Sequence, residues 1–537
     1  MKSISASISK KKLLFFILTM AVFVGSFCVR WHNMSTIPYG IEEDEYAWVA
    51  TARFVEKHID PGARGIWSLH INNAKNFPFS LLVHQLAFSL FGPDILSARK
   101  ILALYSTVSI VVFFFLARKF FRWFTALLVT AAYSFSTYHL VASKIALPSV
   151  YQELPMLLSF FLALQSTSFT GWKRYISILG AGVCIVVALL SYNITYMVPI
   201  ITFGFLLYGC KQHRIPIKQL FVNIGIMCIP LLFVSLFLVQ GIHHEFKAKQ
   251  YIFTESNTKM TSSSVVIDIP NIAAHLNAAL TIMWKPLTNT NSDMLMLFSA
   301  PLIPRFITVT AAIGLVCAVF QFASYWPILL WIMIQVGVYH ILLGLNFPRT
   351  WILTVGSIYI VSGIAFETVC VSSIIKSKGK YFIGICYALC VIYLIYIGMN
   401  VYWTDAVRHY AYRAYVREAF DISKKYMGTK NAVFIVPESN PFWLANTWPT
   451  AVAFSLSWLK TIDSTTLDTR TRQDLGILSI DEFTAKIQNH LIPPCSTFIG
   501  EPARVRELLP YLSSECPDTY RIEAYSVFCV ATTLPRQ

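Results

Sequence analysis

A series of long apolar runs constrains this chain more than any other feature. About eleven runs are apolar over the roughly 17–25 residues that a helix needs to cross the hydrocarbon core of a bilayer. They lie at residues 13–31, 98–117, 123–140, 148–168, 175–191, 195–210, 219–240, 304–322, 326–344, 350–370 and 381–401. Only 13% of the residues are charged, whereas a soluble domain carries about 25%. The sequence therefore predicts a polytopic α-helical membrane protein, and it excludes a soluble enzyme, a disordered scaffold and a fibrous protein.

The distribution of charge predicts the orientation. With the N-terminus inside, the segments assigned to the inside hold 15 Lys and Arg residues and no Asp or Glu. Of the 27 acidic residues, 25 fall in outside segments, and only Glu153 and Glu367 lie in spans. This sorting follows the positive-inside rule. It predicts a multi-pass protein of the plasma (inner) membrane with a cytoplasmic N-terminus and an extracytoplasmic C-terminus. The net charge of +16 then belongs to the membrane surface, and no nucleic-acid partner is expected.

Long outer loops interrupt the predicted transmembrane domain, which covers residues 1–401. The first loop is 32–97 and the second is 241–303. Each contains an apolar stretch that is too short to span, at 78–91 and 272–284. Stretches of this length are typical of interfacial or re-entrant segments. We therefore expect two amphipathic helices on the outer face.

The C-terminal tail, residues 402–537, has a different composition. An apolar run of strand length lies at 431–437, and Ser479 with Glu482 forms a capping box before a helix near 480–490. The pattern from 496 to 534 is that of a strand, a helix and a strand. The sequence therefore predicts a small α/β domain on the outer face.

Four consecutive carboxylates, Glu42 to Glu45, lie in the first outer loop, just after the first span. An amphipathic helix is predicted to follow them, and the dipole of a helix favours anions at its N-terminus. One interpretation is a solvated acidic helix start. The other is a functional carboxylate, because acidic residues are an odd choice for anchoring a loop against anionic lipid. The charges alone leave both interpretations open.

Several motifs, taken in order, resemble the type C glycosyltransferases, which are polytopic enzymes that use polyprenyl-phosphate sugars. The Asp44-Glu45 pair after the first span, followed by Tyr, is similar to the family signature. The segment that starts at Lys75 resembles the family's Lys/His-x-Pro element, which leads to a Phe-Gly. Arg99 falls where the family has an Arg opening the second span. Asn-Phe-Pro-Arg349 is similar to a late Pro-Arg-Tyr element. The subgroup that is most similar holds the protein O-mannosyltransferases and the lipid A aminoarabinose transferase.

Two positions depart from the family pattern. The family often has an Asp at the outer end of the fourth span, but residues 143–149 contain no carboxylate, and the nearest is Glu153. Thr350 stands where the family prefers Tyr. These departures leave the second acidic role and the acceptor pocket open.

The resemblance implies a membrane glycosyltransferase that moves a sugar, with inversion, from a polyprenyl-phosphate donor to a protein, lipid or glycan acceptor on the outer face. By this resemblance Asp44 is the general base, and Glu45 orients Asp44 or the acceptor. Cations stabilise the charge that develops on a departing phosphate. The candidates for this role lie within a few residues of outer span boundaries, and they are Arg349, Lys75, Lys144 and Arg99.

No cofactor is indicated by the sequence. A divalent metal stays open, but no pair of His residues has the helical i,i+4 spacing of a zinc motif. The alternative function is a polyprenyl-linked glycan flippase or another secondary transporter. A transporter usually has related halves with substrate groups at the midplane, whereas this chain has no visible repeat and its carboxylates crowd one face. The enzyme is therefore the favoured hypothesis. The sequence does not assign the sugar or the acceptor.

Overall fold

The computed structural model describes a helical region and five strands. The described residues are 10–34, 45, 49, 78–92, 95–191, 193–232, 272–284, 301–344, 348–371 and 377–408, together with the strands between residues 432 and 533. Among them, six helices are long and apolar enough to cross a membrane. The chain is thus a multi-pass helical membrane protein. A helix also satisfies its own backbone hydrogen bonds, as the bilayer core requires.

A helix is described at every apolar run that the sequence predicts to span. The helices are α1 (Lys10–Trp31), α4 (Ile95–Ala117), α5 (Trp123–Ser134), α6 (Thr137–Ala142), α7 (Pro148–Tyr151), α8 (Glu153–Ser166), α9 (Trp172–Leu189), η2 (Asn193–Met197), α10 (Val198–Gln212), the helix Ile217–Leu232, α13 (Arg305–Phe320), α14 (Phe322–Ile332), η6 (Met333–Leu342), η7 (Pro348–Trp351), α15 (Ile352–Val371) and α16 (Ser377–Arg408). Since only six of the described helices reach spanning length, the number of eleven spans stays a prediction.

Two of the expected spans are broken into shorter helices, and a third changes its helix type. The run 123–140 forms α5 and α6, because Ser136 adopts an extended backbone and its hydroxyl accepts a hydrogen bond from the His139 N–H, which starts a new helix. The run 148–168 forms α7 and α8. The run 326–344 begins as α14 and continues as a π-helix, η6. Residues 78–91 and 272–284 form α3 (Pro78–Phe91) and α12 (Ile272–Trp284), so the two short predicted helices are confirmed as helices.

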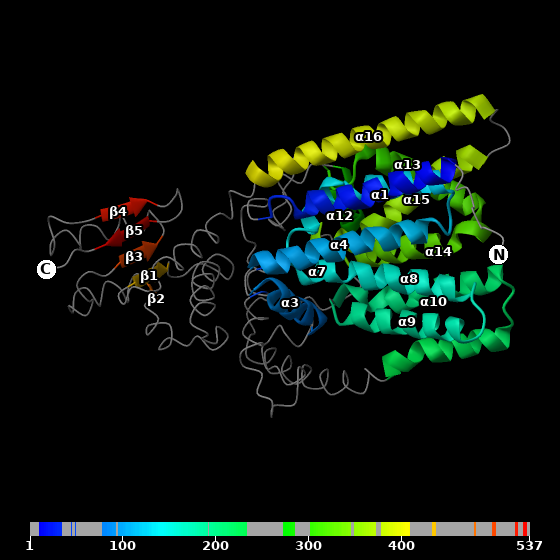
Figure 1. Cartoon of the computed structure of the whole chain (residues 1–537), viewed down its shortest axis with the longest axis horizontal. Coiled ribbons are helices and arrows are strands. Elements are labelled where there is room, and N and C mark those ends of the chain that lie inside the picture. Colours follow the sequence, from blue (N-terminus) through cyan, green and yellow to red (C-terminus); the bar gives the residue numbers. More distant parts are fainter. Residues whose placement is uncertain are drawn as a thin grey trace, which may run out of the picture. The chain divides into compact units, whose positions relative to one another are not determined.

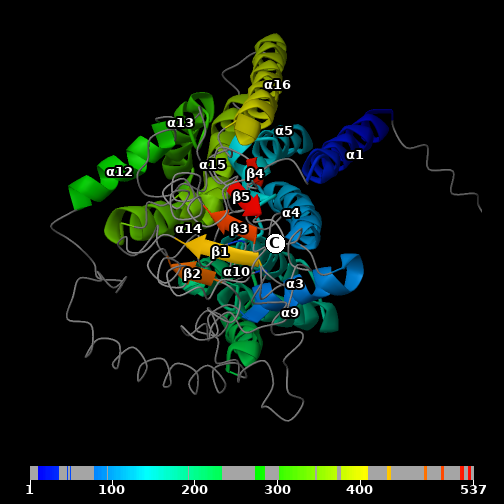
Figure 2. The same ribbon diagram turned by 90° about the vertical axis from the view of Figure 1, so that its left-hand side faces the viewer.

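The chain divides into two compact units. The first comprises Met1–Met34, Lys75–Ser80 and Arg99–Ala406. Its helices lie side by side (Figure 1). The central helix is α15, which is almost entirely buried and packs between α13 and α5 (Figure 2). The contact with α13 requires Gly314, since a Cβ atom there would lie 1.9 Å from the Val361 carbonyl oxygen. Small residues allow membrane helices to approach in this way.

Successive helices of the first unit alternate in direction, so their ends gather at two opposite ends of the bundle. At one end α1, α5 and α9 finish and α4, α8 and α10 begin. This end contains Arg30 and is called the Arg30 end. At the other end α8 and α10 finish, and residue Gly209 of α10 lies beside Thr167. This end contains Lys211 and is called the Lys211 end.

The second unit comprises Ser35–Ala74, Leu81–Ala98 and Val407–Gln537, and it holds a five-stranded sheet. The strands are β1 (Ala432–Val436), β2 (Ile477–Ser479), β3 (Thr497–Gly500), β4 (Arg521–Ala524) and β5 (Val530–Thr533), in the order β2-β1-β3-β5-β4. β1 pairs in parallel with β2 and β3, whereas β5 runs antiparallel to β3 and β4.

The sheet differs from the sequence prediction at the C-terminus. The stretch 520–534, expected as one strand, contains two strands, β4 and β5, that pair with each other in antiparallel. The strands expected at 431–437 and 496–500 are described as β1 and β3. The expected helices lie outside the described residues, so the α/β assignment and the domain boundaries stay predictions.

Candidate functional site

Three cations lie at the Arg30 end of the first unit. Arg30 is in the last turn of α1, Arg99 is near the start of α4, and Lys144 is in the turn after α6. All three are buried, with exposed fractions of 0–1%. Ionisable groups at such positions are costly unless they have partners, and in membrane proteins they usually mark a functional site.

The Lys144 side chain makes one contact with a main-chain carbonyl and one with an aromatic ring. Its ammonium donates a hydrogen bond to the main-chain oxygen of His32 and lies 5.2 Å from the centre of the Tyr402 ring. Burial, together with the positive charges of Arg99 and Arg30, lowers the pKa of Lys144 from its ordinary 10.5 to about 7. The ammonium therefore gains or loses its proton near neutral pH, and a nearby anion would stabilise the charged form.

Arg99 contributes to the same region. One of its guanidinium nitrogens lies 3.4 Å from the main-chain oxygen of Met34, just beyond the end of α1. Its charge contributes to the lowered pKa of Lys144, and so does that of Arg30. Three mutually repelling cations, held out of water, form a region that favours a bound anion.

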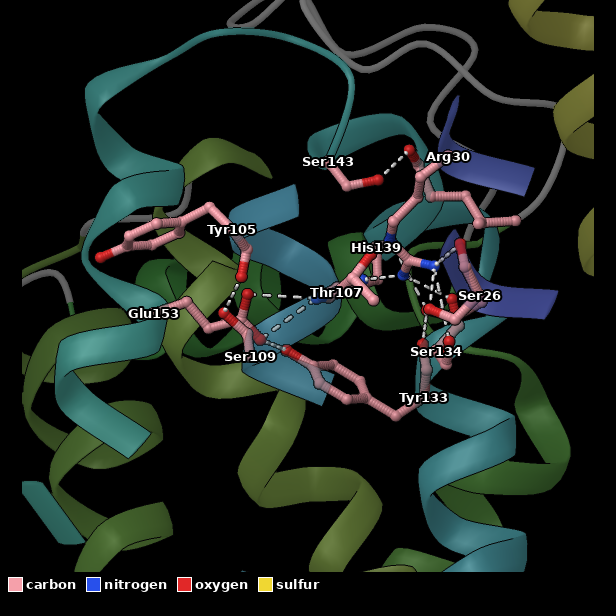
Figure 3. Close-up of polar contacts among 12 residues, drawn as sticks. Ser26, Arg30, Tyr105, Thr107, Ser109, Tyr133, Ser134, His139, Ser143 and Glu153 are labelled. Carbon is pink, nitrogen blue, oxygen red and sulfur yellow. Dashed lines mark hydrogen bonds and ion pairs between the residues drawn. The ribbon is translucent and has the colours of Figure 1, made fainter. Parts of the chain in front are cut away.

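Arg30 is also part of a buried polar network (Figure 3). Its Nη2 atom lies 2.6 Å from His139 Nδ1, and His139 Nε2 lies 3.1 Å from both carboxylate oxygens of Glu153. The Tyr133 hydroxyl also donates to Glu153. A guanidinium has only donors, so Nδ1 of His139 must accept the hydrogen bond. The imidazole proton is thereby assigned to Nε2, which donates to Glu153.

The network joins four helices because Arg30 reaches several acceptors. Besides His139, it donates to the main-chain oxygen and hydroxyl of Ser26 at 3.0 and 2.6 Å, within α1, and to the main-chain oxygen of Ser134 at 2.8 Å. Ser134 ends α5, and the last carbonyls of a helix favour a cation. His139 belongs to α6 and Glu153 begins α8, so the network fixes the helix that precedes the Lys144 turn.

The segment that carries Arg349 lies next to this region. Arg349 is in η7, which packs against α7, the helix that follows the Lys144 turn. Trp351 of η7 is fully buried and stacks on His340 with ring centroids 3.8 Å apart. His340 Nε2 in turn lies 2.9 Å from the Thr354 hydroxyl. These contacts anchor the backbone of η7. The side chain of Arg349 is not among the parts of the chain that the structure describes.

The residues predicted to form the site are only partly described by the structure. Lys144 and Arg99 lie close enough for the charge of Arg99 to lower the pKa of Lys144, and their role at a donor phosphate stays a prediction. Asp44 and Lys75 lie outside the described residues. Glu45 is helical and fully buried, within the second unit. Arg30 and Glu153 were not among the predicted site residues, although an ionisable residue in an apolar run is itself a signal of function.

No group of three or more His, Cys, Asp or Glu residues that could hold a metal ion is found within the described part of the chain. The described side chains of the Arg30 network and its neighbours include three buried cations, the Glu153 carboxylate, the His139 imidazole and several hydroxyls. Among these described side chains positive charge exceeds negative charge, which suits an anionic ligand.

No protein-family model and no curated protein sequence matches the chain. Solved structures do. ArnT from Cupriavidus metallidurans, bound to undecaprenyl phosphate, has a TM-score of 0.53 and 14% sequence identity over 97% of both chains, and ArnT in the apo state has the same values. The apo oligosaccharyltransferase of Archaeoglobus fulgidus has a TM-score of 0.49 and 13% identity over 91% of this chain and 70% of that chain. The resemblance predicted from the sequence is thus confirmed at the level of the fold, because the chain shares the fold of ArnT over nearly its whole length.

Proposed function

We propose that the protein is a membrane glycosyltransferase that moves a sugar from a polyprenyl-phosphate donor to a protein, lipid or glycan acceptor. The observation that carries the proposal is the set of buried cations Arg30, Arg99 and Lys144 at one end of the bundle. The set occurs on the fold of ArnT, which is known as the lipid A aminoarabinose transferase and whose structure holds undecaprenyl phosphate. The proposed setting is the plasma membrane, with the reaction on its outer face and the C-terminal sheet on the same side.

The chemistry requires an anion site and a base. When the sugar leaves, the bond between its anomeric carbon and the phosphate oxygen breaks, and the electron pair stays on the phosphate. Buried cations stabilise this developing charge better than solvated ones, because water does not screen them. Lys144, with its pKa lowered to about 7, takes up a proton when the phosphate binds. An acceptor hydroxyl or amine attacks the opposite face of the sugar, which inverts the anomeric centre.

The remaining roles follow from the sequence resemblance. Asp44 removes the proton of the acceptor as general base, and Glu45 orients Asp44 or the acceptor. Arg349 and Lys75 complete the phosphate site together with Lys144 and Arg99. The packing of η7 on α7 supports Arg349 in this role, since it brings the backbone of Arg349 close to the segment that follows Lys144.

The test is transfer of sugar from a polyprenyl-phosphate sugar in detergent, at matched protein amounts. A general base contributes about 10²–10⁴-fold to the rate, so Asp44→Asn should lower transfer by that factor while expression and membrane insertion persist. Glu42→Gln and Glu43→Gln are the matched controls, since they neutralise neighbouring carboxylates outside the motif. Glu45→Gln should give an intermediate loss.

A second set of variants tests the phosphate site. Lys144→Gln should weaken donor use, because a hydrogen bond between charged partners contributes about 1.5–3 kcal/mol.

Two outcomes would contradict the proposal. Equal activity of all four acidic variants would remove Asp44 from the mechanism. Movement of the lipid between leaflets without transfer of sugar would favour the flippase instead.

A further inference from the structure

A pocket of about 550 Å³ lies at the Lys211 end of the first unit. It is formed by the end of α10, the turn after it, the start of the helix Ile217–Leu232 and the start of α14. Two cations, Lys211 and Arg214, line it together with apolar side chains that include Leu207, Leu220, Phe322 and Trp326. No Asp or Glu is among the described residues that line it. The pocket thus combines a positive charge of two with an apolar wall.

The backbone after α10 holds the two cations next to each other. Arg214 adopts a left-handed conformation with φ of 51°, which is uncommon for a residue other than Gly. Its N–H donates to the Lys211 main-chain oxygen at 3.3 Å, and the Ile215 N–H donates to that of Cys210 at 2.9 Å. This tight turn ends α10 and leads directly into the helix Ile217–Leu232. The chain reversal therefore places both cations at the ends of two helices.

The apolar wall has the composition of a membrane interface. Trp326 packs edge-to-face on Tyr208, with ring centroids 6.1 Å apart, and Phe322 is 60% exposed. Aromatic side chains with one polar group are favoured at the level of lipid headgroups. In a bilayer the exposed wall would face acyl chains, while the cations at the helix ends lie where phosphates are found.

We propose that this pocket binds one anionic glycerophospholipid. Its phosphate contacts Lys211 and Arg214, and an acyl chain lies along Phe322 and Trp326. Charge complementarity selects an anionic lipid, since Lys and Arg side chains near a membrane surface attract anionic headgroups. The Lys211 end is opposite the Arg30 end, so this lipid is separate from the proposed donor. The site does not depend on the proposed glycosyltransferase function.

The experiment uses the full chain in a mild detergent, with added phosphatidylglycerol or phosphatidylcholine of the same acyl chains. Lipid adducts are counted by native mass spectrometry, and the midpoint of thermal unfolding is measured in parallel. Phosphatidylglycerol should bind to saturation and raise the midpoint, because a ligand that binds only the folded state stabilises it. The double variant Lys211→Gln and Arg214→Asn should lower the apparent affinity at least tenfold. Asn is chosen because it tolerates the left-handed conformation.

The matched control is Lys173→Gln with Lys218→Gln. It also removes two exposed cations of the predicted inner side, but neither residue lines the pocket. This control should bind phosphatidylglycerol like the unmodified protein. Phe322→Ser, a change at an exposed position, should weaken lipid binding without loss of either cation. It therefore tests the same site if the double variant does not fold.

Three results would overturn the proposal. The first is equal binding of phosphatidylglycerol by the double variant and by the control, which would mean that general surface charge is responsible. The second is an equal effect of glycerol 3-phosphate, which would identify a site for small anions. The third is equal binding of phosphatidylcholine, which would make the cations irrelevant.

Discussion

The two ends of the helical unit hold the same kinds of charged residue in opposite environments. At the Arg30 end, Arg30, Arg99 and Lys144 are at most 1% exposed. At the Lys211 end, Lys211 and Arg214 are exposed. Exposed cations keep their hydration and serve orientation and lipid contact. Buried cations have lost their hydration, and they persist only where protein groups or a ligand replace it. The difference separates charges that place the protein in a bilayer from charges that are suited to chemistry.

The two carboxylates of the predicted spans are both buried, but they have different partners at the two ends. Glu153 accepts hydrogen bonds from His139 and Tyr133, and it balances Arg30 through the imidazole. Glu367, at the other end, accepts from the Arg122 N–H at 3.2 Å and from the Thr125 hydroxyl. Arg122 and Thr125 are the residues at the start of α5, so Glu367 of α15 caps a neighbouring helix. One carboxylate compensates a buried charge, whereas the other satisfies a helix end.

The largest effect is expected for Arg30→Met. Removing one partner of a buried ion pair typically costs about 3–5 kcal/mol, because the other charge stays buried without compensation. The measurement is the free energy of unfolding in detergent, obtained by titration with a denaturing surfactant. A loss below about 1 kcal/mol would mean that Arg30 and Glu153 are not coupled through His139.

The matched double variant, Arg30→Met with Glu153→Gln, sharpens this test. It removes both charges, while the Gln carbonyl still accepts from His139 and Tyr133. It should regain a substantial part of the stability that Arg30→Met loses. Additive losses in the two single variants would contradict the coupling.

The second effect concerns pH. In the free protein the pKa of Lys144 is about 7, because of burial and the charges of Arg99 and Arg30. Donor binding that needs the ammonium should therefore weaken as pH rises above 7, by up to about tenfold for each pH unit until the pKa of the complex is reached. The donor is a phosphodiester, so its own charge is constant over this range.

The measurement for Lys144 is the affinity for the polyprenyl-phosphate sugar between pH 6 and 9. Lys144→Arg is the control, since an Arg keeps its charge throughout. It should bind the donor with an affinity that changes little with pH. An unmodified protein with the same flat profile would show that Lys144 does not contact the donor.

The sequence predicted the local features of the fold, whereas the roles of the candidate site residues stay predictions. Apolar runs located the helices, and closeness to span boundaries selected Lys144 and Arg99. Two other features depend on contacts between distant residues. The break at Ser136 has no Pro or Gly to signal it, and Thr137 beside it donates to the main-chain oxygen of Gly398 in α16. The contact of Arg30 with His139 joins residues 109 positions apart, which hydrophobic periodicity does not encode.

A smaller effect is expected for Glu367→Gln. A Gln carbonyl can still accept from one of the two donors at the start of α5, but its amide group faces the other donor. Loss of a helix-capping acceptor costs about 0.5–2 kcal/mol. The free energy of unfolding should therefore fall less than in Arg30→Met. An equal fall would mean that Glu367 also compensates a buried charge.

The smallest effect is expected for Arg122→Ala, at the same helix start. The Arg122 side chain is 65% exposed, and its Nε atom lies 3.6 Å from Glu367. Exposed ion pairs contribute about 0.2–1 kcal/mol. The main-chain N–H of residue 122 still donates to Glu367 in the variant, so the cap of α5 persists. The free energy of unfolding should fall by less than about 1 kcal/mol, and the small loss should vanish in high salt, which screens exposed charges. A loss as large as that of Arg30→Met, insensitive to salt, would remove the distinction between exposed and buried cations on which the assignment of the two ends depends.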